Sequence, residues 1–378
     1  VLPVEEVSGI AVPEKEEEDE EEEEDRPKPE KAPAISWQDK EKGTAPEEDE
    51  KQFTPGSNSP EVAEKQSGGD TSENRGIHFD RSRMNWGIED LELLHFFWNR
   101  CGVMGEGVSV AVLDTGADEQ HPDFEGGIKG KFNFAEPRAN DITDRDGRGT
   151  RCAGLIGARG RDSVWGVAPR CNLYIGKILS RDTEFSYTAL LSGMEWAMEK
   201  NVDIIFIGLD LRKYDLTRDD QETFEETVNL ATGRGILVIA PAGDSNASQP
   251  EGRYPSCLEN CLSIGAYDKH GSRYASSIRS FTLDNLAPGE DLLTTATGTA
   301  KTCLFSGSYA AAAFAAGCMA LVINANNENS IPLQALDLLK LARSTATPKK
   351  AGIELRDFEY GYGLINPVKI FKEARKRW

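Results

Sequence analysis

The chain has 378 residues, 38% of them hydrophobic, and a net charge of −21 at neutral pH, which allows one large domain or two ordinary ones. The charge is concentrated near the N-terminus, since residues 1–78 contain 24 acidic and 9 basic side chains. The negative balance argues against a nucleic-acid partner, because phosphate binding needs a basic face, and no apolar run approaches the roughly 18 residues of a membrane span.

Residues 1–78 have the biased composition of a tail. The segment Glu16–Asp25 is a run of negative charge, and Pro, Ser, Gly and Glu dominate from there to Asn74. Such a segment cannot bury enough apolar surface to offset the entropy that it loses on ordering. We therefore predict a disordered acidic tail over residues 1–78 and one folded domain over 79–378. The tail is interpreted as a solvated linker or as a docking segment for a basic partner.

Apolar and amphipathic segments alternate after the tail. The apolar, β-branched run Val108–Leu113 predicts a buried strand, and the small residues of Gly149–Ala158 predict the start of a helix. This alternation predicts an α/β fold with a parallel sheet and helices on both faces, with functional sites at the carboxyl ends of the strands. Further strands are predicted at Leu173–Leu179, Val202–Ile207, Ile236–Ala240 and Cys261–Ala266, and further helices at Ser186–Lys200, Gln221–Ala231, Tyr309–Ile323 and Leu333–Ala342.

Seven cysteines are an odd number, so they cannot all pair within the chain. Cys257 and Cys261 are close enough in sequence to pair, whereas Cys152 and Cys318 lie among small and apolar residues that suit buried thiols. We take this pattern to favour a secretory or extracellular setting slightly over the cytoplasm. The sequence contains no zinc-ligand spacing and no phosphate-binding loop.

Asp114 follows the predicted strand Val108–Leu113 in the string Val-Leu-Asp-Thr-Gly-Ala-Asp-Glu-Gln-His-Pro-Asp-Phe. A carboxylate at the end of a buried strand is well placed for chemistry, although Asp-x-Gly also forms ordinary turns. The longer string is more specific. Through Asp114-Thr115-Gly116 and His121-Pro122-Asp123 it resembles the aspartate motif of the subtilisin-like serine proteases, the subtilase (peptidase S8) family.

The resemblance continues in the same order along the chain. Gly147–Gly154 is similar to the family's histidine motif, with a kexin-like Thr-Arg-Cys-Ala-Gly ending. The resemblance implies a subtilisin-like, doubly wound parallel sheet with helices on both faces. Other segments that match family motifs are Gly166–Pro169, Ser192–Ala197, Pro241–Asp244, Leu286–Gly289, Ser306–Gly317 and Gly361–Asn366.

The resemblance breaks down at the positions that would perform catalysis. Subtilisin carries its triad in the chain order Asp, His, Ser. Asp114 stands at the Asp position, but Arg148 stands at the His position and Tyr309 at the Ser position. Asp244 replaces the asparagine whose amide would donate to the oxyanion, and Ala313 replaces a proline that is usual in the nucleophile helix.

These replacements remove the required chemistry. An arginine with a pKa above about 12 cannot accept a proton near neutrality, and a phenol with a pKa of about 10 is a poor nucleophile. The Asp244 carboxylate would repel the negative charge that develops on the oxyanion. In subtilisin, loss of the serine or the histidine alone costs about 2 × 10⁶ in turnover. We therefore predict that Asp114, Arg148, Tyr309 and Asp244 are all non-catalytic and that the chain is a pseudoprotease.

We further expect Arg148 to be held by Asp114 as a counter-ion, because an unpaired buried charge is costly. Asp244 or the Tyr309 hydroxyl would complete this network. The alternative is that Arg148 turns to solvent and that Asp114 keeps only backbone donors.

A rebuilt triad is the competing interpretation of these positions. Ser308 adjoins Tyr309, but one residue along a helix turns a side chain by about 100°. None of the four histidines is well placed as a base: His78 and His95 precede the first core strand, His121 belongs to the His-Pro-Asp turn, and His270 lies in a polar turn.

The segments Leu179–Tyr187 and Phe206–Asp210 resemble those that line the family's substrate groove, and Gly208, Leu209 and Asp210 are the candidate contact residues. Such a groove can hold an extended peptide by strand addition without cleaving it, and a glycine permits close backbone approach. We predict a non-catalytic protein that binds a protein or an extended peptide there, as a regulator or scaffold. The alternatives are an endopeptidase with a noncanonical site and a structural protein whose acidic tail carries the interaction.

Calcium is the only cofactor that the resemblance raises. Asp123 matches a position that ligates calcium in many subtilases. The loop that should complete the site, Arg159–Ser163, is one residue shorter and carries two arginines, which disfavour a dication. Asp123 is therefore at most a weak calcium ligand, and no cofactor is predicted. The cluster Asp141, Asp144 and Asp146 is interpreted as a solvated loop because Arg145 and Arg148 interleave it.

Overall fold

A computed structural model describes residues 79–139, 141–180, 185–245, 248–298, 301–349 and 356–377. All of them belong to one compact unit. The predicted disordered tail, residues 1–78, lies outside the described residues.

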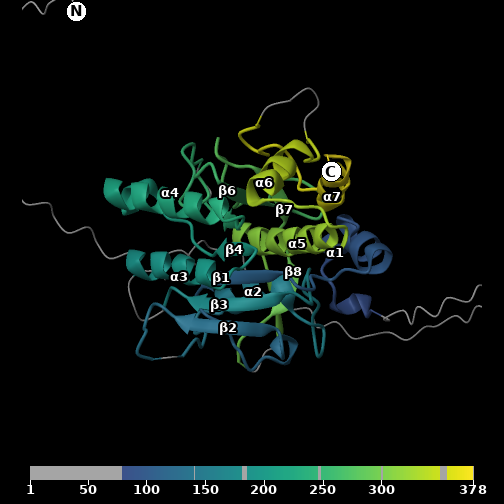
Figure 1. Ribbon diagram of the computed structural model, residues 1–378, viewed down its shortest axis with the longest axis horizontal. Helices are drawn as coiled ribbons and strands as arrows, with labels where there is room; N and C mark the ends of the chain where they lie inside the picture. The colour runs from purple at the N-terminus through teal and green to yellow at the C-terminus, as the bar shows by residue number, and fades with distance from the viewer. Residues whose placement is uncertain are drawn as a thin grey trace, which may run out of the picture. The chain divides into compact units, whose positions relative to one another are not determined.

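A seven-stranded sheet with the order β2-β3-β1-β4-β5-β6-β7 forms the centre of the described structure (Figure 1). All neighbouring strands in it are parallel. The chain adds β2 and β3 on one side of β1 and the later strands on the other, so the order reverses beside β1. The strands are β1 (Ser109–Asp114), β2 (Ile128–Asn133), β3 (Asn172–Lys177), β4 (Ile204–Ile207), β5 (Leu237–Pro241), β6 (Cys261–Tyr267) and β7 (Asn285–Pro288).

Helices cover both faces of this sheet, as predicted from the sequence. In β1, Val110 and Val112 pack into one core with α2 and α5, whereas Ala111 and Leu113 pack into the other with α3 and α4. This division follows from the alternation of side chains along a strand. The helical segments are η2 (Arg81–Arg83), α1 (Trp86–Asp90), η3 (Leu94–Cys101), η4 (Pro122–Phe124), α2 (Arg148–Gly157), α3 (Tyr187–Glu199), η5 (Lys213–Asp215), α4 (Arg218–Gly233), α5 (Ser308–Glu328), α6 (Ala335–Ser344) and α7 (Pro367–Arg377).

Central strands are buried on both faces, and this explains why the sequence reveals them. All four residues of β4 are fully buried, as the near-continuous apolar run of a two-sided strand requires. The edge strand β2 is mostly exposed and carries Lys129, Gly130 and Lys131, so it has no apolar pattern to detect. The two-stranded antiparallel hairpin of β8 (Leu292–Thr295) and β9 (Thr302–Phe305) also lacks such a run.

Helix α5 passes through the core and begins at the candidate site. By length and composition alone it is apolar enough to cross a membrane, but 89% of its most apolar 18-residue window is buried. The expectation that no apolar run approaches the length of a membrane span is therefore wrong for this helix. The helix is apolar on every side because α2, α7 and the strands β5, β6 and β7 surround it.

All seven cysteines are free in the structure. Cys257 and Cys261 therefore do not form the disulfide that their sequence spacing permits. Cys152 and Cys318 are fully buried, as predicted.

Gly317 should be indispensable to the packing of α5. A Cβ atom there would lie 2.6 Å from the Cβ atom of Val167, so we expect Gly317→Ala to lower the free energy of unfolding by about 1–3 kcal/mol through overpacking. Gly233, also helical, has no atom within 4 Å of such a Cβ. Gly233→Ala should leave stability unchanged or raise it by up to about 1 kcal/mol. Urea denaturation measures both, and equal effects of the two substitutions would contradict the packing argument.

Candidate functional site

The candidate site lies at the carboxyl ends of the central strands, where the strand order reverses. Asp114 is the last residue of β1 and Arg148 is the first residue of α2. The end of β4 leads into Gly208, and α5 begins at Ser308. Parallel sheets form their sites at such a topological switch point.

Asp114 and Arg148 form a buried ion pair. The Asp114 side chain is 0% exposed and the Arg148 side chain 13% exposed. Arg148 Nε donates a hydrogen bond of 2.9 Å to Asp114 Oδ1, and Arg148 Nη2 lies 2.9 Å from the same oxygen. The Thr115 N–H donates to that oxygen as well, at 2.7 Å. The expected counter-ion arrangement is therefore present, and the alternative in which Arg148 turns to solvent is wrong.

Arg148 remains charged in this pair. Burial acts to lower the pKa of the Arg148 guanidinium, but Asp114 and Tyr309 raise it above its usual value. Burial raises the pKa of Asp114, and Arg148 opposes that change. Arg148 is therefore a permanent cation at this position and has no lone pair with which to accept a proton.

Tyr309 links this pair to a second one. The Arg148 guanidinium carbon lies 4.8 Å from the centroid of the Tyr309 ring, which is cation–π geometry. The Tyr309 hydroxyl donates to Asp210 Oδ1 at 2.5 Å, and Arg253 Nη1 lies 3.5 Å from Asp210 Oδ2. Burial, and then Asp210, raise the pKa of Tyr309 well above its usual value. Tyr309 therefore joins the network through its ring face toward Arg148. Its hydroxyl bonds to Asp210, so the expectation that the hydroxyl holds Arg148 is wrong.

Asp244 does not join this network, contrary to one of the two expected completions. Its carboxylate accepts the Ser308 N–H at 3.0 and 2.9 Å and the Ser308 hydroxyl at 3.0 Å. Ser276 Oγ donates to it at 3.1 Å. The unpaired N–H groups and the positive dipole at the start of α5 attract this carboxylate. Burial nevertheless raises the pKa of Asp244 to about 6, against the lowering effect of the Ser308 donors.

Another carboxylate, Asp144, builds the turn that presents Arg148. It is buried and accepts the N–H of Gly147 at 2.7 Å and of Thr150 at 2.8 Å. It also accepts the hydroxyls of Thr115 and Thr150 at 2.9 and 2.7 Å. The interpretation of this acidic cluster as a solvated loop is therefore wrong for Asp144, because the N–H groups at the start of α2 bind its carboxylate.

The three candidate groove residues are enclosed by the chain itself. Leu209 is fully buried, and Asp210 is nearly so. A Cβ atom at Gly208 would lie 1.9 Å from Asp114 Oδ2, so this glycine makes room for Asp114. Beyond them, Leu211 exchanges two backbone hydrogen bonds of 2.8 Å with Tyr254. Part of the segment Leu179–Tyr187, residues 181–184, lies outside the described residues.

The histidines in the described part of the chain have other surroundings. His95 and His270 are exposed. His121 is buried, with Nε2 at 2.6 Å from the Lys301 carbonyl oxygen and Nδ1 accepting the Asp123 N–H at 3.1 Å. His121 therefore has a structural role in its turn, and His78 lies outside the described residues.

The surroundings of Asp123 do not fit a calcium ion. Its carboxylate accepts N–H groups of Asp162, Ser163 and Val164 at 2.8, 3.1 and 3.0 Å and the Ser163 hydroxyl at 2.6 Å. These donors hold the pKa of Asp123 below its usual value against burial. A calcium site surrounds the cation with oxygen ligands, whereas here donors surround the carboxylate. Within the described residues no cluster of His, Cys, Asp or Glu could hold a metal.

Fold and site together define a doubly wound α/β protein with its candidate site at the carboxyl ends of β1 and β4. The model of the subtilase family (Peptidase_S8) matches residues 105–363. The chain therefore belongs to the subtilase family.

Curated relatives and a solved structure agree with this assignment. An intracellular serine protease of Paenibacillus polymyxa is 37% identical over 234 residues, which cover 60% of this chain and 68% of that protein. Subtilisin BL of Lederbergia lenta is 35% identical over 226 residues, covering 60% of this chain and 79% of that protein. A lanthipeptide protease of known crystal structure shares the fold, with a TM-score of 0.63 and 21% identity over 77% of this chain and 98% of that chain.

Sequence reasoning missed two residues of the site, Asp144 and Arg253. Asp144 precedes α2 in a run of alternating charges, which resembles an exposed loop. Arg253 lies in the polar string Gln-Pro-Glu-Gly-Arg, and only the folding of that loop brings it to Asp210. The position of Asp144 just before the predicted helix Gly149–Ala158 is the one local sign, because the first N–H groups of a helix lack partners within the helix.

Removal of the Arg148 guanidinium should be costly. Arg148→Ala leaves Asp114 buried without its counter-ion, so we expect the free energy of unfolding to fall by about 3–5 kcal/mol. Adding Asp114→Asn should recover part of that loss. Arg218→Ala, which removes an exposed ion pair with Glu222, is the matched control and should change stability by less than about 1 kcal/mol. Equal losses in the two arginine variants, measured by denaturant unfolding, would contradict the counter-ion role.

Asp244 should make stability depend on pH. Its pKa is about 6 in the folded chain, above the value of about 4 for an unfolded aspartate. Asp244 is protonated in both the folded and the unfolded chain below pH 4, and it is ionised in both above pH 6. Between these values only the unfolded chain loses the proton readily, so the wild type should lose stability relative to Asp244→Asn as the pH rises. The relative loss should reach about 3 kcal/mol. Unfolding at several pH values measures it, with exposed Asp219→Asn as control. A difference from Asp244→Asn that stays constant with pH would refute this assignment.

Proposed function

We propose that this chain is a catalytically inactive member of the subtilase family that acts by binding a protein or an extended peptide, as a regulator or scaffold. The observation that carries it is the buried Arg148 guanidinium at 2.9 Å from Asp114. We also propose that this member of the family has kexin-like features, on the basis of the ending of the segment Gly147–Gly154.

Triad catalysis needs a base that Asp114 orients and that takes the proton of a nucleophile. Arg148 fills the space between Asp114 and the Tyr309 ring, and it is a cation at every physiological pH. The Tyr309 phenol is bonded to Asp210, and its raised pKa keeps it protonated. Neither the base nor the nucleophile of acyl transfer is available from these residues.

The surroundings of the expected oxyanion position support the same conclusion. A carboxylate with a pKa of about 6 is mostly ionised at neutral pH. Asp244 also engages the Ser308 N–H, so its negative charge lies at the start of α5. An oxyanion hole instead needs donors directed at the developing charge, and Asp244 opposes that charge.

The enclosed groove residues restrict how a partner would bind. Asp210 and Tyr309 fill the floor beside β4 with a hydrogen bond between their own side chains. A bound segment would therefore pair through its backbone along the groove, without inserting a side chain at this point. The half-buried residues Phe185 and Tyr187 would form part of the remaining wall.

One observation favours the alternative, a noncanonical endopeptidase. The Ser308 hydroxyl donates to Asp244 at 3.0 Å, and a carboxylate with a pKa of about 6 is in the range of a general base. Ser308 is, however, 0% exposed, and its hydroxyl also accepts the Gly243 N–H at 3.2 Å. A substrate carbonyl cannot reach this oxygen without opening the start of α5.

Incubation with casein and with a serine-directed phosphonate tests the proposal. The wild type should neither cleave the casein nor take up the phosphonate. Arg148→His with Tyr309→Ser should recover little activity, because Asp244 still opposes the oxyanion. Adding Asp244→Asn should then raise turnover by about 10²–10³, the contribution of the corresponding asparagine in subtilisin. Cleavage by the wild type that Ser308→Ala abolishes would overturn the proposal in favour of the noncanonical enzyme.

The binding half of the proposal needs a separate test. A displayed peptide library selected on the full chain should yield extended segments whose affinity falls in Phe185→Ala. The exposed Phe281 supplies the matched control, and Phe281→Ala should leave the affinity unchanged. If both variants bind the selected peptides like the wild type, the groove is not the binding surface.

A further inference from the structure

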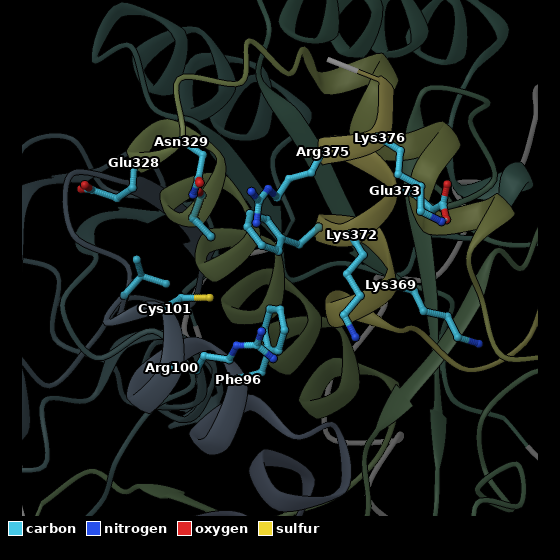
Figure 2. A pocket seen from close by; sticks show the side chains of 13 residues that line it. Phe96, Arg100, Cys101, Glu328, Asn329, Lys369, Lys372, Glu373, Arg375 and Lys376 are labelled. Carbon is cyan, nitrogen blue, oxygen red and sulfur yellow. The ribbon is translucent and has the colours of Figure 1, made fainter.

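A basic pocket lies at the far end of α5 from the candidate site. It is enclosed by η3, the last turns of α5 and α7 (Figure 2) and has a volume of about 900 Å³. Because α5 has 21 residues, its two ends are separated by roughly 30 Å. The pocket is therefore distinct from the site around Asp114.

Two aromatic rings form the floor of this pocket. Phe96 of η3 and Phe371 of α7 are nearly buried, and their ring centroids lie 5.8 Å apart in an edge-to-face arrangement. Val103 and Ala325 add apolar surface beside them. The floor is rigid because both helices belong to the main core.

Three cations converge on this floor from two helices. The Arg100 guanidinium carbon lies 5.8 Å from the Phe96 centroid, and Lys372 Nζ lies 5.3 Å from the same centroid. The Arg375 guanidinium carbon lies 5.8 Å from the centroid of Phe371. Figure 2 shows these three side chains reaching into the space between the helices, whereas Lys369 and Lys376 point away from it.

Within the part of the chain that the structure describes, these three charges have no carboxylate in an ion pair with them. Two acids line the pocket, but Glu373 is paired with Lys376 and Glu328 lies at its edge (Figure 2). Among the residues that the structure describes, no carboxylate forms an ion pair with Arg100, Lys372 or Arg375. Three like charges in one pocket repel one another, and an anion bound between them would relieve that repulsion.

Cys101 marks the point where two of the cations meet. Burial raises the pKa of the Cys101 thiol, and Arg100 and Arg375 both act to lower it. Guanidinium groups from η3 and α7 therefore both lie near this sulfur atom. This convergence differs from a flat row of surface lysines, because the two helices approach the pocket from different sides.

We propose that this pocket binds a compact small molecule that carries several phosphate groups. Two guanidinium forks and an ammonium match phosphate oxygens, and the volume lies within the range of small-ligand pockets. Residues 79–378 carry 40 acidic and 34 basic side chains, so a long polyanion would have to cross a surface of net negative charge, whereas a compact ligand stays within the local positive field. This proposal is independent of the proposed function.

Titration calorimetry of the full chain with tripolyphosphate tests the pocket. Arg100→Gln, Lys372→Gln and Arg375→Gln together should weaken binding at least about tenfold, since each removes a charge-assisted contact. The matched control combines Lys200→Gln, Arg234→Gln and Lys340→Gln, which remove three exposed cations elsewhere. It should leave affinity within about twofold, because distant exposed charges are screened. Equal weakening in both sets would mean diffuse electrostatic attraction and would overturn the proposal.

Alkylation of cysteines followed by peptide mapping provides a second measurement. Tripolyphosphate should slow alkylation of Cys101 but not of Cys303, which is also half-buried and lies near Arg151. Equal rates at Cys101 with and without the ligand would contradict the assignment. Because phosphates also occur on lipids, vesicles with a polyphosphorylated headgroup form a separate arm. Binding to vesicles without binding to tripolyphosphate would indicate that this region contacts a membrane surface, and it would overturn the proposal of a small-molecule pocket.

This chain could also fill the pocket itself. A competing occupant is the acidic run of residues 47–50. The experiment therefore measures tripolyphosphate binding to a full-length variant in which these four acids are replaced by the corresponding amides. Tripolyphosphate binding that appears only in this variant would show an internal occupant and would overturn the proposal.

Discussion

A carboxylate that is withdrawn entirely from water needs positive charge or donors around it, and Asp114 imposes this requirement on the centre of the fold. It ends the strand that pairs with both β3 and β4. Arg148 supplies the charge, and the absence of a side chain at Gly208 supplies the room. Much of the candidate site therefore stabilises one buried negative charge at the end of β1.

The start of α5 meets a similar requirement in a different way. Asp244 is held by the N–H group and the hydroxyl of Ser308 and by the hydroxyl of Ser276, without a cation among these partners. Asp114 is held by a guanidinium. The two carboxylates bind different partners. Asp244 caps the start of α5, whereas Asp114 belongs to an ion-pair network that includes Tyr309, Asp210 and Arg253.

The sequence predicted the parts of the fold that are buried on both sides. Strands β1, β3, β4, β5 and β6 have apolar runs, and α5 has an Ala-rich one, because two-sided burial leaves no room for polar residues. Strand β2 lies at the edge of the sheet, and its exposed lysines interrupt the apolar pattern from which a strand is predicted. Motif order placed Asp114, Arg148, Tyr309 and Asp244 at one site, since the family motifs follow the carboxyl ends of the strands.

The partners of those residues were harder to foresee. The ring of Tyr309 faces Arg148 while its hydroxyl reaches Asp210, and no linear pattern distinguishes these two uses of one side chain. Arg253 arrives from a loop whose local sequence resembles a surface turn. Asp144 looked solvated because charge alternates around it, and only the turn before α2 shows that its acceptors are needed inside.

The interlocked contacts of Tyr309 have an evolutionary consequence. A histidine at position 148 would remove the permanent cation that Asp114 faces, and a serine at position 309 would remove both the hydroxyl that Asp210 accepts and the ring under Arg148. Each single replacement leaves a buried group without its partner, a loss of about 1–3 kcal/mol or more. That is a large share of the 5–15 kcal/mol by which a domain is stable. A return to a catalytic triad would therefore require several coordinated substitutions, because each single step destabilises the fold.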